Sequence, residues 1–327
     1  MSVVLRLQPF DRDLECEAGE TVLDAVLRGG LQVPFGCRTG GCGTCRMRLV
    51  EGEVDDGGGA LALTPEERAA GWFLPCVTRI LTGGVVDAGD LELREHVGPR
   101  AHATEVVRNE RVTPEIHALR LRVLDPDGLQ FTAGQFVNVE IPGGTDTRSY
   151  SIASAPSRPG ELDLYVKRRD GRFSGLLDGR LAPGAPLRLF GPFGQLRIRL
   201  SHRPIVMIAS GTGLAPLLSM LHDLADHGNQ RPVRLVVQAG GAGELFALDE
   251  LAAIAAAMPG FELVTVAAPT RTGALADTLI GAIGDARDHD AYLGGSRWSI
   301  EAALPVLLQL GVRRRNIYFD VFTPAVP

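Results

Sequence analysis

The sequence predicts three domains in a row: a small α+β unit, an antiparallel β-barrel and a doubly wound parallel sheet. Three observations lead to this prediction. At 327 residues, the chain is too long for one ordinary hydrophobic core. All five cysteines lie at or before position 76. The spacing of apolar residues changes twice along the chain, which predicts domains at residues 1–98, 99–200 and 201–327.

The first domain combines short strands with short helices. Alternating apolar residues predict two strands within residues 3–17. Thr21 and Asp24 form the pattern of a helix cap, and we expect that helix to end at Gly29. A second helix is expected to begin at Thr64, which is followed by a proline at the first helical position.

The second domain contains strands and turns but no long helical pattern. Strands at regular spacing, with glycine and proline between them, are typical of a β-barrel. The expected strands are residues 116–124, 135–141, 148–154, 162–168 and 185–191.

In the third domain, strands alternate with helices. This order is typical of parallel sheets that bind nucleotides at the carboxyl ends of their strands. The expected strands are residues 204–210, 233–240, 261–268, 291–295 and 316–322.

Charge and composition exclude several classes of protein. Residues 1–98 carry nine arginines against sixteen acidic residues, a net charge of −7, which leaves about +1 for the rest of the net −6. Nucleic acid is therefore not an expected partner. The longest apolar run, residues 205–221, is interrupted by Ser and Gly, so no membrane span is expected. The N-terminus lacks an export signal, so we expect a cytoplasmic protein, with a monomer as the default.

Four cysteines form the strongest motif. Cys37, Cys42 and Cys45 follow the spacing C-x4-C-x2-C, and Cys76 comes thirty residues later. This is the ligand spacing of a plant-type [2Fe-2S] cluster. Zinc is the alternative, although structural zinc usually has two short Cys-x2-Cys pairs, and disulfides do not suit the expected compartment. Cys16 lies outside the spacing and is expected to be a small core residue.

The segment CRTGGCGTC and the residues leading to Cys76 resemble the ferredoxin domain of reductase components of bacterial multicomponent oxygenases. The likeness covers the whole chain and is greatest to reductases of naphthalene-type dioxygenases and toluene-type monooxygenases. It implies a β-grasp ferredoxin domain, a flavin-binding barrel and a nicotinamide domain, in that order. The order of domains, with the ferredoxin domain first, resembles that of the branch of the family that uses FAD.

The barrel carries the residue types that a flavin needs. Arg148, Ser149, Tyr150 and Ser151 provide a cation for the diphosphate, an aromatic face for the ring and small hydroxyl groups. An ordinary edge strand is the alternative. The segment resembles the ferredoxin-NADP reductase superfamily, which implies arginine on phosphate, tyrosine against the ring and serine near N5. The same resemblance implies further flavin contacts at Lys167, Gly171, Phe173 and Ser174.

A glycine-rich turn lies between a predicted strand and helix of the third domain. Gly211, Thr212, Gly213 and Pro216 belong to GTGLAP, where glycines let a dinucleotide phosphate approach the helix start. The hexapeptide alone is a weak signal. After an RxYS barrel it resembles the same superfamily.

The chain departs from the family at the end of the fourth strand of this domain. Relatives usually have Cys-Gly-Pro-Pro there, whereas residues 294–297 read Gly-Gly-Ser-Arg. The resemblance implies that Gly294 and Gly295 lie near the nicotinamide, but it puts the rate of hydride transfer in doubt. At the C-terminus, Asp320 and Phe322 match an acidic and an aromatic residue that relatives place near the nicotinamide and over the flavin.

The choice of coenzyme is predicted from two loops. The segment GGAGELF has no basic residue for a 2′-phosphate, which favours NADH. Thr270 and Arg271 lie where NADP-using relatives have a Ser-Arg pair, so NADPH is the alternative.

Together these sites predict a reductase that passes electrons from NADH through FAD and a [2Fe-2S] cluster, one at a time, to a partner protein. The expected acceptor is an aromatic-ring dioxygenase, directly or through a Rieske-type ferredoxin. A diiron monooxygenase is the second choice, and a cytochrome P450 or a deoxysugar-forming dehydratase is open. The alternative outside enzymes is a redox-binding or sensing protein that has lost turnover.

Overall fold

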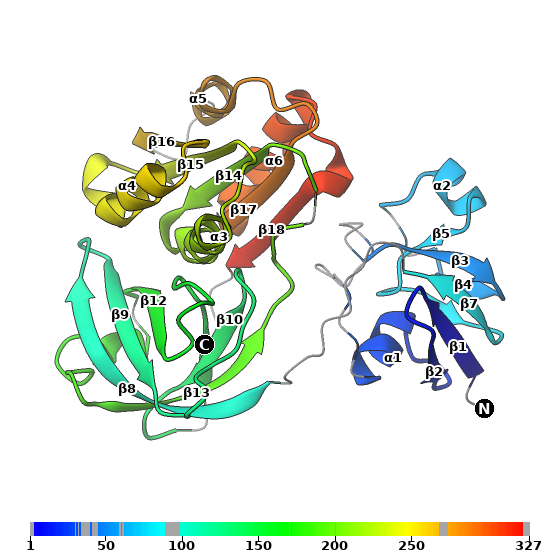
Figure 1. Cartoon of the computed structure of the whole chain (residues 1–327), viewed down its shortest axis with the longest axis horizontal. Coiled ribbons are helices and arrows are strands. Elements are labelled where there is room, and N and C mark those ends of the chain that lie inside the picture. The colour runs from blue at the N-terminus through cyan, green and yellow to red at the C-terminus, as the bar shows by residue number, and fades with distance from the viewer. Residues whose placement is uncertain are drawn as a thin grey trace. The chain divides into compact units, whose positions relative to one another are not determined.

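The computed structural model forms two compact units, residues 1–98 and 99–327, shown in Figure 1. The structure describes residues 3–29, 31, 33, 40, 45–58, 60, 62–88, 99–144, 146–169, 171–199, 201–267 and 274–322.

The first unit has a five-stranded mixed sheet in the order β2-β1-β7-β3-β5. Strands β1 and β7 are parallel, and the other neighbours are antiparallel. A second, two-stranded sheet pairs β4 with β6. The strands are β1 (Val3–Gln8), β2 (Arg12–Cys16), β3 (Met47–Glu51), β4 (Val54–Asp55), β5 (Trp72–Phe73), β6 (Arg79–Ile80) and β7 (Gly84–Asp87).

Both helices of this unit begin as the sequence predicts. Helix α1 (Val22–Arg28) has Thr21 as its N-cap, and the Thr21 hydroxyl accepts a hydrogen bond from the backbone N–H of Asp24. It ends at Gly29. Helix α2 (Pro65–Ala69) begins with a complete capping box that starts at Thr64.

The second unit begins with a six-stranded antiparallel sheet that curls into a nearly closed barrel, in the order β11-β10-β13-β8-β9-β12. A bridge between Ile152 and Leu164 links the two outer strands. All five predicted strands form. The structure adds a sixth, β8. The strands are β8 (Arg100–Arg111), β9 (Ile116–Val123), β10 (Phe136–Glu140), β11 (Thr147–Ser151), β12 (Glu161–Lys167) and β13 (Pro186–Phe193).

The rest of the second unit is a parallel sheet in the order β16-β15-β14-β17-β18, which confirms the doubly wound prediction. Alternate residues of β14 and β15 face helices α3 and α4 on one side and α5 and α6 on the other. The strands are β14 (Ile205–Ser210), β15 (Val233–Ala239), β16 (Phe261–Ala267), β17 (Asp290–Ser296) and β18 (Ile317–Phe322). The helices are α3 (Leu214–Asp226), α4 (Leu248–Ala257), α5 (Ala274–Ile283) and α6 (Arg297–Gln309).

The barrel and the parallel sheet share one hydrophobic core within the second unit. Helix α3 lies at this junction, where the Ser219 hydroxyl donates a hydrogen bond to the Ser154 carbonyl at 2.8 Å. The Tyr165 hydroxyl of the barrel donates to Glu250 of α4 at 3.4 Å. The barrel contributes to this core the buried residues Ile116, Ala133, Ala153 and Leu196. The barrel therefore holds a defined position against the nucleotide-binding sheet.

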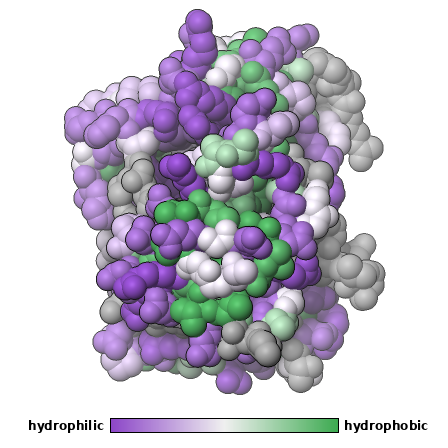
Figure 2. Space-filling model, turned by 90° about the vertical axis from the view of Figure 1, so that its right-hand side faces the viewer, coloured by the Kyte–Doolittle hydropathy of each residue, from purple (hydrophilic) through white to green (hydrophobic). Residues whose placement is uncertain are grey.

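Eight large apolar side chains are exposed among the residues that the structure describes. Val4, Val50 and Leu81 of the first unit are each about half exposed. Figure 2 shows hydrophobic residues gathered among hydrophilic ones on the face that it presents. None of the helices in the described ranges is long and apolar enough to cross a bilayer.

Candidate functional site

Two of the four predicted cluster ligands lie at the same end of one strand pair. Strands β3 and β5 are antiparallel, with Met47 opposite Phe73. Continuing this register by two residues places Cys45 opposite Pro75, next to Cys76. Both thiols are buried, at 1% and 8% exposure. Cys45 and Cys76 therefore lie at the same end of the β3–β5 pair, and both belong to the buried core of the first unit.

The turn that carries Cys76 is fastened to helix α1. The backbone N–H of Leu23 donates to the Pro75 carbonyl at 3.0 Å, and that of Val22 donates to the Thr78 carbonyl at 2.9 Å. These bonds use two of the N–H groups that a helix start leaves unpaired. They fix the position of Cys76.

A cation lies directly beside Cys45. The Arg46 guanidinium is 5.0 Å from the centre of the Trp72 ring and 2.6 Å from a carboxylate oxygen of Glu67. A positive charge at this position can offset part of the negative charge of a thiolate-bound cluster. The Trp72 and Glu67 contacts hold that charge in place.

Cys16 behaves as a core residue, as predicted. It is 1% exposed and packs among Leu5, Leu14 and Val22. Burial raises the pKa of the Cys16 thiol to about 11. A metal ligand has to be a thiolate, so this environment does not favour metal binding at Cys16.

The predicted flavin tetrapeptide lies on β11, an outer strand of the barrel. Register pairs Tyr150 with Val137 and Arg148 with Val139 on the inner neighbour β10. Ser151 is 8% exposed. The Ser149 hydroxyl donates a hydrogen bond to the side-chain oxygen of Asn138 at 2.7 Å.

Tyr150 lies against a residue from the second predicted flavin segment. Its ring centroid is 5.3 Å from that of Phe173, with the planes tilted by 40°. Burial raises the pKa of Tyr150, so the phenol stays protonated. The fold therefore brings the tetrapeptide and the segment after β12 together.

That second segment contains the 3-10 turn η1 (Ser174–Leu176). The Ser174 hydroxyl is bonded to the backbone of Arg169, and the N–H of Gly175 donates to the Gly171 carbonyl at 2.9 Å. Lys167, at the end of β12, pairs with Glu115 at 2.8 Å. Its ammonium thus has a carboxylate partner within the barrel.

The glycine turn and the end of β17 touch through their backbones. Gly211, Thr212 and Gly213 form the 3-10 turn η2, and Pro216 lies in the first turn of α3. A Cβ added to Gly213 would lie 2.1 Å from the Gly294 carbonyl carbon. Such a distance is far inside van der Waals contact, so the two glycines are required at this crossing.

The register of β17 and β18 brings the predicted C-terminal residues to the same edge. Gly294 pairs with Asp320, Gly295 with Val321, and Ser296 with Phe322. Gly294 also pairs with Ala209 near the end of β14. The carboxyl ends of three strands thus carry the glycine turn, the two glycines and Asp320. Burial raises the pKa of Asp320 to about 6.

Four predicted contacts lie outside the residues that the structure describes: Cys37, Cys42, Thr270 and Arg271. A cavity of about 510 Å³ on the barrel is lined in part by His102, Asp125 and Arg188. None of the predicted cofactor contacts lines that cavity.

Comparison with protein families divides the chain into three matched regions. A 2Fe-2S iron-sulfur cluster binding domain matches residues 5–81, an oxidoreductase FAD-binding domain matches residues 103–198, and an oxidoreductase NAD-binding domain matches residues 207–301. The reductase component of propane 2-monooxygenase from Gordonia sp. (strain TY-5) is 32% identical, covering 98% of this chain and 96% of that protein. This chain belongs to the family of oxygenase reductase components.

Two further comparisons agree. The reductase component of phenol 2-monooxygenase from Pseudomonas sp. (strain CF600) is 32% identical to this reductase over 99% of the chain and 96% of that protein. The crystal structure of an Amycolatopsis cytochrome P450 reductase superposes with a TM-score of 0.69 and 31% identity, covering 99% of this chain and all of that one. The reductase is therefore an NAD(P)H-dependent flavin enzyme with a [2Fe-2S] domain, and its relatives are components of oxygenase and P450 systems.

The residues present fit these cofactors. Cys45 and Cys76 are two buried thiols at the same end of the β3–β5 pair, and the carboxyl edge of the parallel sheet carries a turn in which Gly213 has no room for a side chain. Sequence reasoning missed the crossing of Gly213 with Gly294, and it missed Asn109 and His117 beneath η1. No sequence pattern pointed to Asn109, because the strand that carries it, β8, was not predicted.

Proposed function

We propose that this reductase takes electrons from NADH and delivers them singly to an oxygenase component. The observation that supports the proposal is that two predicted cluster ligands are buried at the same end of one strand pair, while the second unit holds an antiparallel barrel against a parallel nucleotide-type sheet. When bound, FAD supplies two-electron chemistry toward the nicotinamide and one-electron chemistry toward the cluster.

The barrel residues bind and orient the flavin in this proposal. Arg148 supplies positive charge for the diphosphate, and Tyr150 supplies an aromatic face backed by Phe173. Ser151, a buried hydroxyl, is a hydrogen-bond partner for the ring. Lys167 contributes charge near the diphosphate while pairing with Glu115. Gly171, Phe173 and Ser174 shape the segment that the diphosphate meets.

The edge of the parallel sheet binds the nicotinamide coenzyme. Gly211, Thr212 and Gly213 admit its diphosphate close to the backbone, because side chains would block this approach. Gly294 and Gly295 leave room beside them. Asp320 lies in the same register row and presents a carboxyl group that is protonated in part near pH 6. We keep Phe322 as the aromatic cover for the flavin.

The acceptor is proposed from the relatives. Both curated relatives described above are reductases of monooxygenases, at 32% identity over nearly the whole chain. We therefore place a monooxygenase component first and an aromatic-ring dioxygenase, reached directly or through a Rieske-type ferredoxin, second. A P450 acceptor is third, since the P450 reductase is 31% identical. A cytoplasmic location, a monomeric state and boundaries at residues 98 and 200 stay predictions.

The test is to mix the full protein, without oxygen, with NADH and separately with NADPH. Flavin bleaching and then reduction of cytochrome c are followed. NADH is expected to bleach the flavin at lower concentration than NADPH, because GGAGELF offers no cation for a 2′-phosphate. If neither coenzyme bleaches bound flavin, the redox-binding or sensing alternative replaces this proposal.

A further inference from the structure

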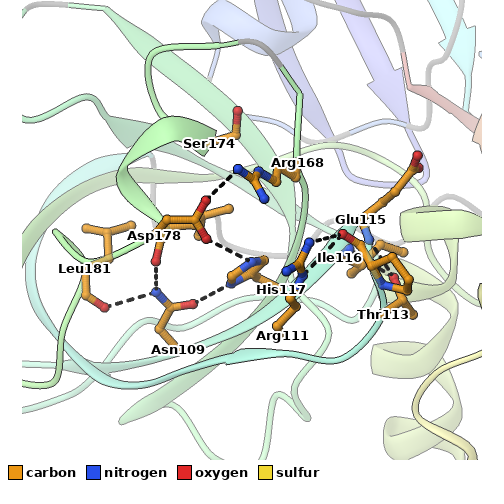
Figure 3. A network of polar contacts seen from close by, with 12 residues as sticks. Asn109, Arg111, Thr113, Glu115, Ile116, His117, Arg168, Ser174, Asp178 and Leu181 are labelled. Carbon is orange, nitrogen blue, oxygen red and sulfur yellow. Dashed lines mark hydrogen bonds and ion pairs between the residues drawn. The ribbon is translucent and has the colours of Figure 1, made fainter.

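The segment that carries the predicted flavin contacts Gly171, Phe173 and Ser174 is tied to the barrel by a partly buried polar network (Figure 3). Asn109 of β8 and His117 of β9 lie beneath the segment. His117 is only 5% exposed. Neither residue belongs to a flavin motif, so the network needs a separate explanation.

Asn109 joins the segment directly to the barrel. Its side-chain N–H2 group donates to the carbonyls of Leu177 and Leu181, at 2.8 and 3.2 Å. Two carbonyl acceptors fix the orientation of the amide. The oxygen of the Asn109 amide therefore faces Nδ1 of His117, 2.9 Å away.

This orientation determines where the proton of His117 lies. The Asn109 oxygen can only accept, so Nδ1 of His117 carries the hydrogen and Nε2 is bare in the neutral ring. Nε2 is buried and has no hydrogen-bond partner among the described residues. It faces a carboxylate oxygen of Asp178 at 3.9 Å, and the other oxygen of Asp178 binds Arg168 at 2.8 Å.

The surroundings of His117 favour its neutral form. Burial is the main cause that lowers the pKa of His117, and the positive charges of Arg111 and Arg168 lower it further. Asp178 acts in the opposite direction and raises it. If the segment leaves the barrel, His117 meets water and regains its ordinary pKa, so protonation favours the released segment.

We propose that Asn109 and neutral His117 are positioning residues for FAD, which hold residues 171–181 on the barrel, and that protonation of His117 loosens this segment and weakens FAD binding. The inference rests on the proposed flavin site. It predicts a direction: FAD affinity is constant in mildly alkaline solution and falls as pH decreases through the titration of His117.

The experiment measures FAD affinity of the full chain between pH 5.5 and 8, from the fluorescence of released FAD. The cluster absorbance is recorded in the same samples, so that loss of the cluster is detected separately. For one linked proton, affinity is expected to fall by at most about tenfold per pH unit on the acid side.

His117→Asn is the deciding variant. Its amide can still donate to the Asn109 oxygen, but it does not titrate, so FAD affinity should lose its acid step. The matched control is His102→Asn, which removes the other buried histidine of the barrel; His102 is bonded to Asp125 and does not contact the segment. This control should keep the acid step.

Asp178→Asn provides a second readout if His117→Asn folds poorly. It removes the charge that favours protonated His117, so the acid step should move to lower pH. An acid step unchanged in both His117→Asn and Asp178→Asn overturns the inference. A wild-type protein that binds FAD with no acid step also overturns it. Failure to bind FAD at any pH instead contradicts the proposed function on which the inference rests.

Discussion

Gly294 lies where there is no room for a Cβ atom, so only glycine fits this position. A Cβ on Gly294 would lie 2.1 Å from the carbonyl oxygen of Gly213. The backbone of Gly294 is held by the sheet, and the backbone of Gly213 is held at the start of helix α3. Neither backbone can therefore move away at low cost. The cysteine that relatives usually have near this position would therefore clash with the glycine turn.

We predict that Gly294→Cys, which restores the residue usual in relatives, weakens the protein. The free energy of unfolding should fall by about 1 to 3 kcal/mol, the usual cost of overpacking, and the KM for NADH should rise. Urea denaturation and steady-state kinetics measure both.

Gly281→Ala is the control for Gly294→Cys, because a Cβ at this position in helix α5 meets nothing within 4 Å. It should raise the free energy of unfolding by about 0.5 to 1 kcal/mol. Equal stability of Gly294→Cys and the wild type would show that the Gly213 contact is not constraining.

Asp320 gives a prediction about pH. Its pKa is raised by burial to about 6, so the fold disfavours the charged carboxylate. Its contribution to the free energy of unfolding is complete below the ordinary Asp pKa and is lost as pH rises through 6. Asp320→Asn should therefore stabilise the protein by about 2 kcal/mol at pH 8 and by less at pH 5. A gain of the same size at both pH values in urea denaturation would contradict the assignment.

At the scale of elements, the pair β3 and β5 determines which thiols can share a cluster. Cys45 and Cys76 lie at the same end of this pair, whereas Cys16 lies on β2, at the opposite edge of the same sheet from β5. Proximity to the motif in sequence is thus less informative than the pairing of the strands.

We predict that Cys76→Ser abolishes most of the bound iron and the visible absorbance of the cluster. Cys16→Ser should keep both, and should lower the free energy of unfolding by about 1 to 2 kcal/mol because it buries a hydroxyl. The iron content per chain and the absorption spectrum of each variant test this prediction. Comparable iron loss in the two variants would mean that Cys16 takes part in metal binding.

The elements that sequence predicted well are those with regular apolar spacing. Every predicted strand of the parallel sheet forms, and β14, β15 and β17 are buried along nearly their whole length, as expected for central strands covered on both faces. Strand β8 was missed because its buried side chains include His102 and Thr104, which break the apolar alternation. The pairing of its backbone, rather than apolar content, makes it a strand.

Contacts between residues far apart in the chain could not be predicted from the sequence. The motifs named Gly213 and Gly294 separately, but no local pattern shows that their backbones touch. The proposed role of His117 likewise depends on its contacts with Asn109 and Asp178, which are 8 and 61 positions away in the sequence. Such pairs follow from the fold as a whole and need the structure.

For the whole molecule, charge is divided unequally along the chain. Residues 1–98 carry a net charge of −7 and the remainder about +1. An acidic cluster domain attracts a basic acceptor over long range, and salt screens this attraction. Binding of a small coenzyme in the second unit should depend much less on such a field.

We therefore predict that electron transfer to cytochrome c, a basic acceptor, slows by about tenfold between low salt and 0.3 M salt. Flavin reduction by NADH should change by less than about twofold, because its contacts are local. Stopped-flow measurements at several salt concentrations separate the two steps. A rate of transfer to cytochrome c that is independent of salt would show that the acidic unit does not guide the acceptor.

One-electron delivery to a partner requires that Cys37, Cys42, Cys45 and Cys76 bind iron and sulfide. The decisive measurement is metal and acid-labile sulfide analysis of protein purified without oxygen, with an electron paramagnetic resonance spectrum after reduction. We expect two iron and two sulfide per chain and the signal of a reduced [2Fe-2S] cluster. Colourless protein with one zinc per chain and no sulfide would contradict the account.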